Sequence, residues 1–163
     1  MLITTAESAS KMSFLISNGI FTGAAIYIDL VTKHARVQLP IEYDLQEWNE
    51  EFDRAKILQS LLTVVASASG VAAYYCSKQS DATRPWWLVA AALQGFVFPF
   101  TMLCIMPTNH ELKALLQQNR QENANSGEDR AKSLLRKWHK LHAVRIVASL
   151  AAMGVATWLV TKK

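Results

Sequence analysis

Cysteine and the short motifs that usually mark a catalytic or metal site are scarce in this chain of 163 residues. It contains two cysteines, Cys76 and Cys104, and neither belongs to a Cys-x-x-Cys pair. A His-Glu-x-x-His motif, a glycine-rich phosphate loop and a recognisable serine or cysteine nucleophile motif are also absent. These absences argue against the familiar zinc, nucleotide-binding and hydrolase sites.

Charged residues are missing from two long apolar stretches, 57–77 and 85–109, and two further stretches, 12–32 and 141–161, hold one charge each. The hydrocarbon core of a bilayer is about 30 Å thick, and about 20 helical residues cross it. A soluble bundle would need amphipathic helices, whereas the second and third stretches are apolar on all faces. We therefore expect an integral, multi-pass membrane protein with spans at about 12–32, 57–77, 85–106 and 141–161.

The expected fold is all-α, a single domain over 1–163 that forms a membrane four-helix bundle. Small residues fill the spans, as in SNGIFTGAA, VVASASGVAA and VASLAAMGVA. Such residues let membrane helices approach closely, and they allow a homo-oligomer without requiring one. Polar sequence with helical spacing adjoins the second, third and fourth spans, so these helices should extend beyond the bilayer on one face.

Local signals predict where the elements begin, end and bend. Span one should be followed by an irregular connection over 32–43, and Asp44 should cap the second helix. Pro99 should kink the third helix, and Ser126 should mark the start of the fourth. The two cysteines should lie near opposite faces of the bilayer as small buried residues, too far apart for a disulfide.

Lysine and arginine are unevenly shared between the two ends of the spans. Eleven of the 17 lie in the two long connections, and five lie at the termini and in the short connection around 78–84. The positive-inside rule then predicts that the long connections are cytoplasmic. The net charge of +4 does not indicate a nucleic-acid partner. The expected partners are membrane lipid and a small hydrophobic ligand.

Polar residues gather at the end of the spans that carries the long connections. An ionisable group at membrane depth is a functional candidate, because leaving it unpaired costs several kcal/mol. An ion pair between Asp29 and Arg145 would be a purely structural alternative. The candidates come from all four helices: Tyr27, Asp29, His34, Arg36, Glu47, Trp48, Asn109, His110, Trp138, His139, His142 and Arg145.

A transition metal is the weaker alternative for this cluster. His34, His139 and His142 would supply nitrogen ligands, with Asp29 as a fourth. His139 and His142 are only three residues apart, however, and no denser ligand spacing accompanies them. The sequence therefore predicts no cofactor.

Four stretches of the chain, GAAIYIDLVTKHARV, EWNEEFDRAKILQSLL, FPFTMLCIMPTNHELKAL and LRKWHKLHAVRIVASL, carry a family resemblance. Together they resemble the anthrone-oxygenase-like family of four-span membrane proteins. The resemblance covers nearly the whole chain and implies, as in some fungal members, oxidation of an anthrone to an anthraquinone. The recurring marks of the family fall here on His34, Arg36, Glu47, Trp48, Pro107, Thr108, Asn109, Trp138, His142 and Arg145.

Two functions remain open from the sequence. In the first, His142 is the base of an oxygenase, with His34 in reserve, and Asn109 and Arg145 stabilise the enolate oxygen. Trp48, Trp138 and Tyr27 would then line an aromatic slot, Asp29 would hold Arg145 or orient a histidine, and His34 and Arg36 would contact substrate. In the second, the bundle binds or transports a lipid or quinone, or serves as a scaffold, without catalysis.

Overall fold

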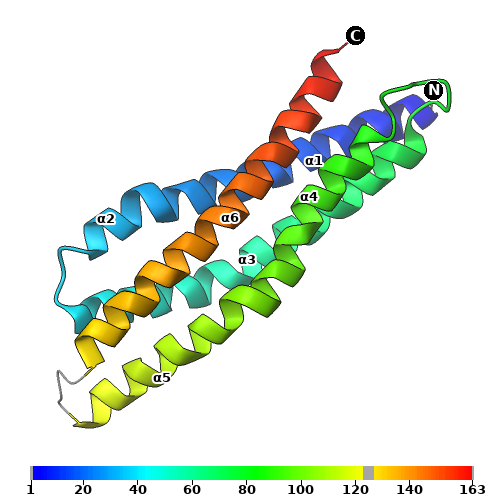
Figure 1. Ribbon diagram of the computed structural model, residues 1–163. Helices are drawn as coiled ribbons and strands as arrows, with labels where there is room; N and C mark the ends of the chain where they lie inside the picture. The colour runs from blue at the N-terminus through cyan, green and yellow to red at the C-terminus, as the bar shows by residue number, and fades with distance from the viewer. Residues whose placement is uncertain (1, 123–126, 163) are drawn as a thin grey trace.

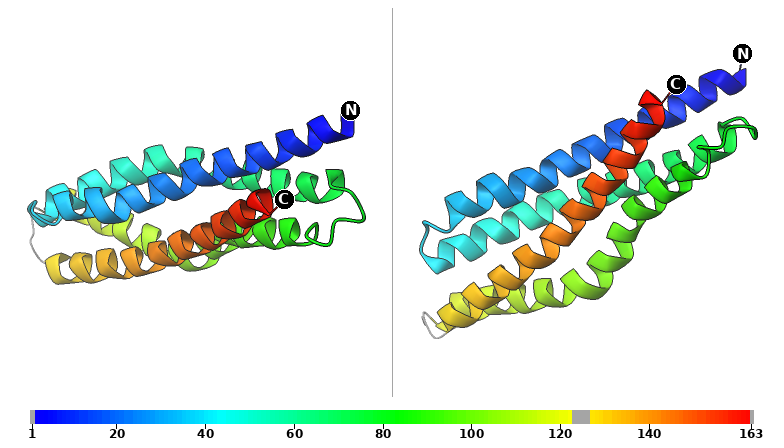
Figure 2. Two further views of the ribbon diagram at one scale, coloured as in Figure 1. Left: turned by 90° about the horizontal axis from the view of Figure 1, so that it is seen from above. Right: turned by 45° about the horizontal axis from the view of Figure 1, so that its top comes forward.

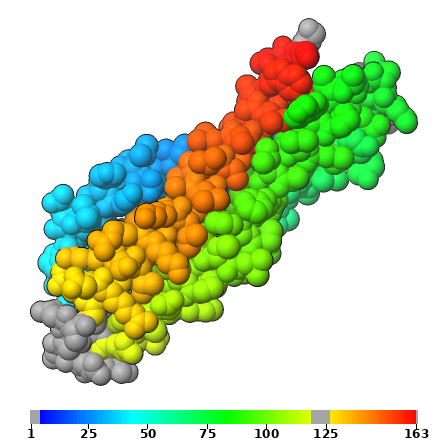
Figure 3. Space-filling model, viewed as in Figure 1, coloured from blue at the N-terminus to red at the C-terminus, as the bar shows by residue number. Residues whose placement is uncertain are grey.

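The computed structural model describes residues 2–122 and 127–162, and this part of the chain is entirely helical, without strands. Figure 1 shows the helices side by side in one elongated bundle, and the space-filling view in Figure 3 shows the same elongated shape. Both termini lie at one end of it, together with the connection between α3 and α4. The elements are α1 (Leu2–Tyr27), the π-helical turn η1 (Ile28–Thr32), α2 (Lys33–Arg36), α3 (Ile41–Cys76), α4 (Trp86–Phe100), the π-helical turn η2 (Thr101–Ile105), α5 (Met106–Glu122) and α6 (Glu128–Thr161).

Four helical segments are long and apolar enough to cross a membrane, which confirms the predicted fold class and supports a multi-pass membrane protein. Many large apolar side chains in these segments, such as Leu103 and Val147, point out of the bundle. Outward-facing apolar side chains suit a surface that contacts lipid. The candidate spans are Thr5–Arg36, Ile41–Cys76, Trp86–Gln118 and Glu128–Thr161.

Small residues bring the spans into close contact, as the sequence predicts. A Cβ atom added to Gly70 on α3 would lie 2.9 Å from Cβ of Ala91 on α4 and 3.0 Å from the ring of Phe14 on α1. Three helices therefore meet at this position with no room for a side chain. This is the packing expected of helices that associate without a strong hydrophobic driving force between them.

Beyond the spans, α3, α5 and α6 continue and pack against one another. Their extensions share an apolar cluster that includes Leu45, Trp48, Leu112, Leu135 and Trp138. This apolar cluster holds the three extensions together, and Figure 2 shows them meeting at the end opposite the termini.

The first connection is shorter than predicted. Instead of an irregular segment over 32–43, the helix of span one continues through η1 and α2 to Arg36. Asp44 does not cap α3, because Pro40 occupies that position and forms no side-chain cap. Asp44 lies in the first turn of α3, and its carboxylate is 3.5 Å from Nε of Arg36. The capping prediction was wrong because Pro40, with its fixed φ, begins the helix earlier.

Pro99 lies one residue before the end of α4, and η2 begins after Phe100. Proline has no N–H to donate to the carbonyl four residues earlier, and a π-helical turn is one way for a helix to absorb that disruption. The right-hand view of Figure 2 shows the chain changing direction between α4 and α5. The predicted start at Ser126 lies outside the described residues, and α6 begins at Glu128.

Both cysteines are free, in agreement with the predicted absence of a disulfide. The expectation that both are buried was wrong. Cys104 is exposed on η2 and Cys76 is half-buried at the end of α3. Their positions within apolar spans did not reveal which face of each helix they occupy.

Candidate active site

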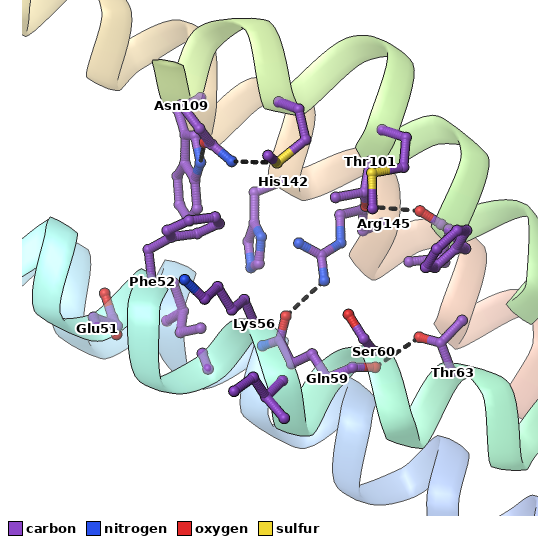
Figure 4. Close-up of a pocket in the computed structure, with 18 of the residues that line it drawn as sticks. Glu51, Phe52, Lys56, Gln59, Ser60, Thr63, Thr101, Asn109, His142 and Arg145 are labelled. Atoms are coloured by element: carbon purple, nitrogen blue, oxygen red, sulfur yellow. Dashed lines mark hydrogen bonds between the residues drawn. The ribbon is translucent and has the colours of Figure 1, made fainter. Parts of the chain in front are cut away.

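A cavity of about 570 Å³ lies between α3 on one side and α4, η2, α5 and α6 on the other. Its wall is mostly apolar, with a few polar side chains that point inward, and Figure 4 shows how these approach one another. A pocket of this size and character is typical of a site for a small hydrophobic molecule. Five of the nine residues predicted for the site line it: Trp48, Asn109, Trp138, His142 and Arg145.

His142 reaches the cavity from α6 and is almost completely buried. Its Nε2 atom is 3.1 Å from the backbone carbonyl oxygen of Ala25 on α1. A carbonyl oxygen only accepts hydrogen bonds, so Nε2 carries the hydrogen and Nδ1 of the neutral ring holds a lone pair. Nδ1 has no hydrogen-bond partner among the described residues. The ring is therefore held in one tautomer and keeps one basic nitrogen unpaired.

Arg145 lies one turn further along α6, buried beside the same cavity. Its Nη2 donates a 2.6 Å hydrogen bond to Oε1 of Gln59 on α3, and its guanidinium lies 5.4 Å from the ring centre of Phe21. No carboxylate among the described residues pairs with it, and its Nε atom is unpartnered. A buried cation without an acidic partner is costly, so this position suits a ligand that is or becomes negatively charged.

The predicted ion pair between Asp29 and Arg145 is absent from the described residues. Asp29 instead lies 3.3 Å from Nδ1 of His139 and 3.5 Å from Nζ of Lys33, outside the cavity. The reason is the antiparallel register of α1 and α6, in which Phe21 meets Arg145 and Ala25 meets His142. Asp29, four residues after Ala25, therefore reaches His139 rather than Arg145.

Asn109 and Trp138 form a second polar contact in the wall. Nε1 of Trp138 donates a 2.8 Å hydrogen bond to Oδ1 of Asn109, and Nδ2 of Asn109 donates a weaker bond to Sδ of Met106. The Trp138 ring stacks on His142, with ring centres 4.9 Å apart and an interplanar angle of 8°. Asn109 on α5 therefore orients Trp138, and Trp138 in turn covers one face of the candidate base.

Trp48 continues this aromatic wall from α3. It meets Trp138 edge to face and stacks on Phe52, with ring centres 6.1 Å and 5.7 Å apart. Together these rings form an aromatic, apolar part of the cavity wall. The sequence predicted Trp48 and Trp138 for such a surface, but it did not identify Phe52.

Tyr27, His34 and Arg36, like Asp29, lie outside the cavity. Tyr27 and His34 are exposed on the surface of the bundle. Arg36 is buried, and its Nη1 donates a 2.5 Å bond to Oε2 of Glu51, a residue that does line the cavity. Arg36 can therefore influence the site only through Glu51. The metal alternative gains no support, because the described residues contain no group of three histidine, cysteine or acidic side chains that could hold an ion.

Gln59 is the most informative residue that the sequence reasoning missed. It is buried on α3, bonds Arg145, and lies four residues before the buried Thr63, which also lines the cavity. Nε2 of Gln94 donates a hydrogen bond to Oγ1 of Thr63, and Nδ2 of Asn18 donates one to Oε1 of Gln94. Hydrogen bonds therefore link polar groups from three helices in the bundle interior. A search for uncharged polar residues four apart within a span would have found the pair Gln59 and Thr63.

Comparison with known proteins places the chain in a family. The family model described as anthrone oxygenase matches residues 48–155, a segment that includes every predicted residue that lines the cavity. The chain is 34% identical over 162 residues to the anthrone oxygenase AgnL2 of Paecilomyces divaricatus, covering 93% of this chain and 98% of that protein. No solved structure matches it.

Proposed function

Because this chain belongs to the anthrone oxygenase family, we propose that it is a membrane enzyme that oxidises an anthrone-like substrate to the anthraquinone with O₂. The observation that carries the proposal is the pairing, in one apolar cavity, of a histidine and an arginine. Among the described residues, one histidine nitrogen has no hydrogen-bond partner and the arginine has no acidic partner. A base and a cation at the same cavity are what the reaction requires.

The first step is removal of a proton from the methylene carbon opposite the anthrone carbonyl. Nδ1 of His142 accepts this proton, and the C–H electron pair delocalises into the rings and onto the carbonyl oxygen. Arg145 and the amide of Gln59 stabilise the negative oxygen by hydrogen bonds in a site with little water. A neutral histidine suits this role because Nδ1 carries a lone pair that no described residue engages.

The second step consumes O₂ and needs no cofactor. The electron-rich anion passes an electron to O₂, and the two radicals combine into a peroxide on the same carbon. Protonated His142 returns its proton to give the hydroperoxide. Loss of the remaining C–H proton, cleavage of the O–O bond and release of water then leave a carbonyl. One anthrone and one O₂ thus give one anthraquinone and one water.

The walls of the cavity fit a flat aromatic substrate. Trp48, Phe52 and Trp138 present ring faces and edges to one side of it. Met102 on η2 and Met106 on α5 add flexible apolar surface to the wall. The substrate would lie among these side chains with its carbonyl toward Arg145.

The direct test uses purified protein in lipid nanodiscs with anthrone under air. We expect anthraquinone, measured by its absorbance, to form well above the rate in empty nanodiscs. Saturable binding of anthrone without faster oxidation would instead favour a protein that binds or carries such molecules. If the protein neither binds anthrone nor oxidises it, the proposal is contradicted.

For the topology, we propose that the long connections are cytoplasmic, because eleven of the 17 lysines and arginines lie there. An exposed position in the first of these connections, Leu39, can be changed to cysteine in a variant that lacks both native cysteines. A membrane-impermeant thiol reagent applied to intact cells should leave this cysteine unlabelled. Labelling from outside would reverse the orientation.

A further inference from the structure

We propose that the cavity opens sideways into the acyl-chain layer of the membrane, through a gap between α3 and the junction of α4 with η2. Ile57 and Leu61 on α3, Phe98 on α4 and Met102 on η2 line the cavity and are also exposed on the surface of the bundle. A side chain with both properties lies at the mouth of a cavity. Lys56 and His110 share both properties, so the mouth continues from these four apolar residues toward the polar end of the bundle. A molecule dissolved in the leaflet can therefore reach His142 without first crossing water.

The depth of these residues places the mouth in hydrocarbon. All four lie within the charge-free stretches 57–77 and 85–109. Their exposed neighbours Leu58 and Leu103 are also apolar. A surface composed of such side chains is solvated by acyl chains rather than by water.

Contacts between α3 and α5 narrow the end of the cavity toward the long connections. Nζ of Lys113 on α5 lies 2.8 Å from Oδ1 of Asp53 on α3, and Nζ of Lys56 lies 2.6 Å from the same oxygen. Both ammonium groups also lie over the ring of Phe52. Past this ion-pair cluster the helices are joined by the apolar core around Trp48 and Leu112.

The occupant that fits this route is an apolar aromatic molecule that partitions into the bilayer. The cavity wall is mostly apolar, and Arg145 and Gln59 are among its buried polar groups. Other polar residues line it toward the end that carries the long connections: Glu51, Lys56, His110 and Lys113. Such a molecule would enter with its apolar body surrounded first by acyl chains and then by Phe98 and Met102. O₂ dissolves better in hydrocarbon than in water, so the same route would serve both substrates. This proposal concerns access and does not require that the protein be catalytic.

A nitroxide spin label inside the cavity tests the route without any substrate. The label is attached at Thr101→Cys, a half-buried position of the wall, in a variant in which Cys76 and Cys104 are alanine. Its collision rates with lipid-soluble O₂ and with the water-soluble nickel chelate NiEDDA are measured in nanodiscs. We expect frequent collisions with O₂ and few with NiEDDA.

A matched pair of substitutions shows whether O₂ comes through the proposed mouth. Leu61→Trp places bulk in the mouth and should lower the O₂ collision rate severalfold. Leu58→Trp is the control, because Leu58 has similar exposure, 53% against 59%, but does not line the cavity. The unfolding temperatures of both variants verify that the bundle is intact.

Three results would overturn the proposal. Dominant collisions with NiEDDA would show that the cavity opens to water. Rare collisions with both reagents would show that it is closed. Equal O₂ collision rates in the Leu61→Trp and Leu58→Trp variants would show that O₂ enters elsewhere.

Discussion

Replacing His142 by glutamine is expected to lower turnover of an anthrone by about 10²- to 10⁴-fold, the range that a general base usually contributes. A glutamine amide can still donate a hydrogen bond to the carbonyl of Ala25, as Nε2 of His142 does. It has no basic nitrogen, so only the proton acceptor is lost. The measurement is kcat for anthraquinone formation in nanodiscs, with the unfolding temperature of each sample determined alongside.

The control for this substitution is His34→Gln. His34 is exposed and does not line the cavity, so the same change there should leave kcat within about twofold of the native value, in line with the small effects of surface substitutions. Comparable losses in both variants, or a fully active His142→Gln protein, would mean that His142 is not the base. If the His142→Gln protein unfolds and the His34→Gln protein does not, His142 has a structural role.

Replacing Arg145 by methionine should lower kcat and leave stability unchanged or higher. The loss in kcat is expected to be about 10²- to 10³-fold, the effect of removing one donor to an oxyanion. Methionine fills a similar volume beside Phe21 and removes a buried charge that has no acidic partner among the described residues. The lost bond to Gln59 costs about 1 kcal/mol, less than the several kcal/mol of a buried uncompensated charge.

The control is Arg136→Met, the same change at an exposed position on α6. It should alter neither kcat nor the unfolding temperature measurably. The informative result is that Arg145→Met lowers kcat without lowering stability. Replacing a residue that serves only for packing would lower both together. A strongly destabilised Arg145→Met protein with normal kcat would contradict the assignment of Arg145 to the enolate oxygen.

The fold was largely predictable because the length of an apolar stretch is a direct consequence of the thickness of the bilayer. The stripe of Trp138, His142 and Arg145 was also predictable, since residues three or four apart share a face of a straight helix such as α6. Trp48 and Asn109 met this stripe as expected, because α3 and α5 extend past the membrane beside it.

Four candidate residues at the end of span one do not line the cavity: Tyr27, Asp29, His34 and Arg36. His34 and Arg36 follow the π-helical turn η1, which changes the facing of the residues after it, and no sequence signal predicted this turn. For Tyr27 and Asp29, closeness to the membrane end did not reveal which residues of the neighbouring helices they would face. Gln59 was missed for a different reason, because the criterion for a candidate within the spans was an ionisable side chain and glutamine is uncharged.

The measurement that tests the central claim most directly is a structure of the protein with the product anthraquinone bound. We predict that the flat ligand lies between Trp138 and Met102, with one carbonyl oxygen within hydrogen-bond reach, about 3 Å, of Arg145 and Gln59. The opposite carbonyl carbon should lie beside Nδ1 of His142. Anthraquinone bound elsewhere, or bound in this cavity with neither carbonyl near Arg145 and neither near His142, would contradict the account.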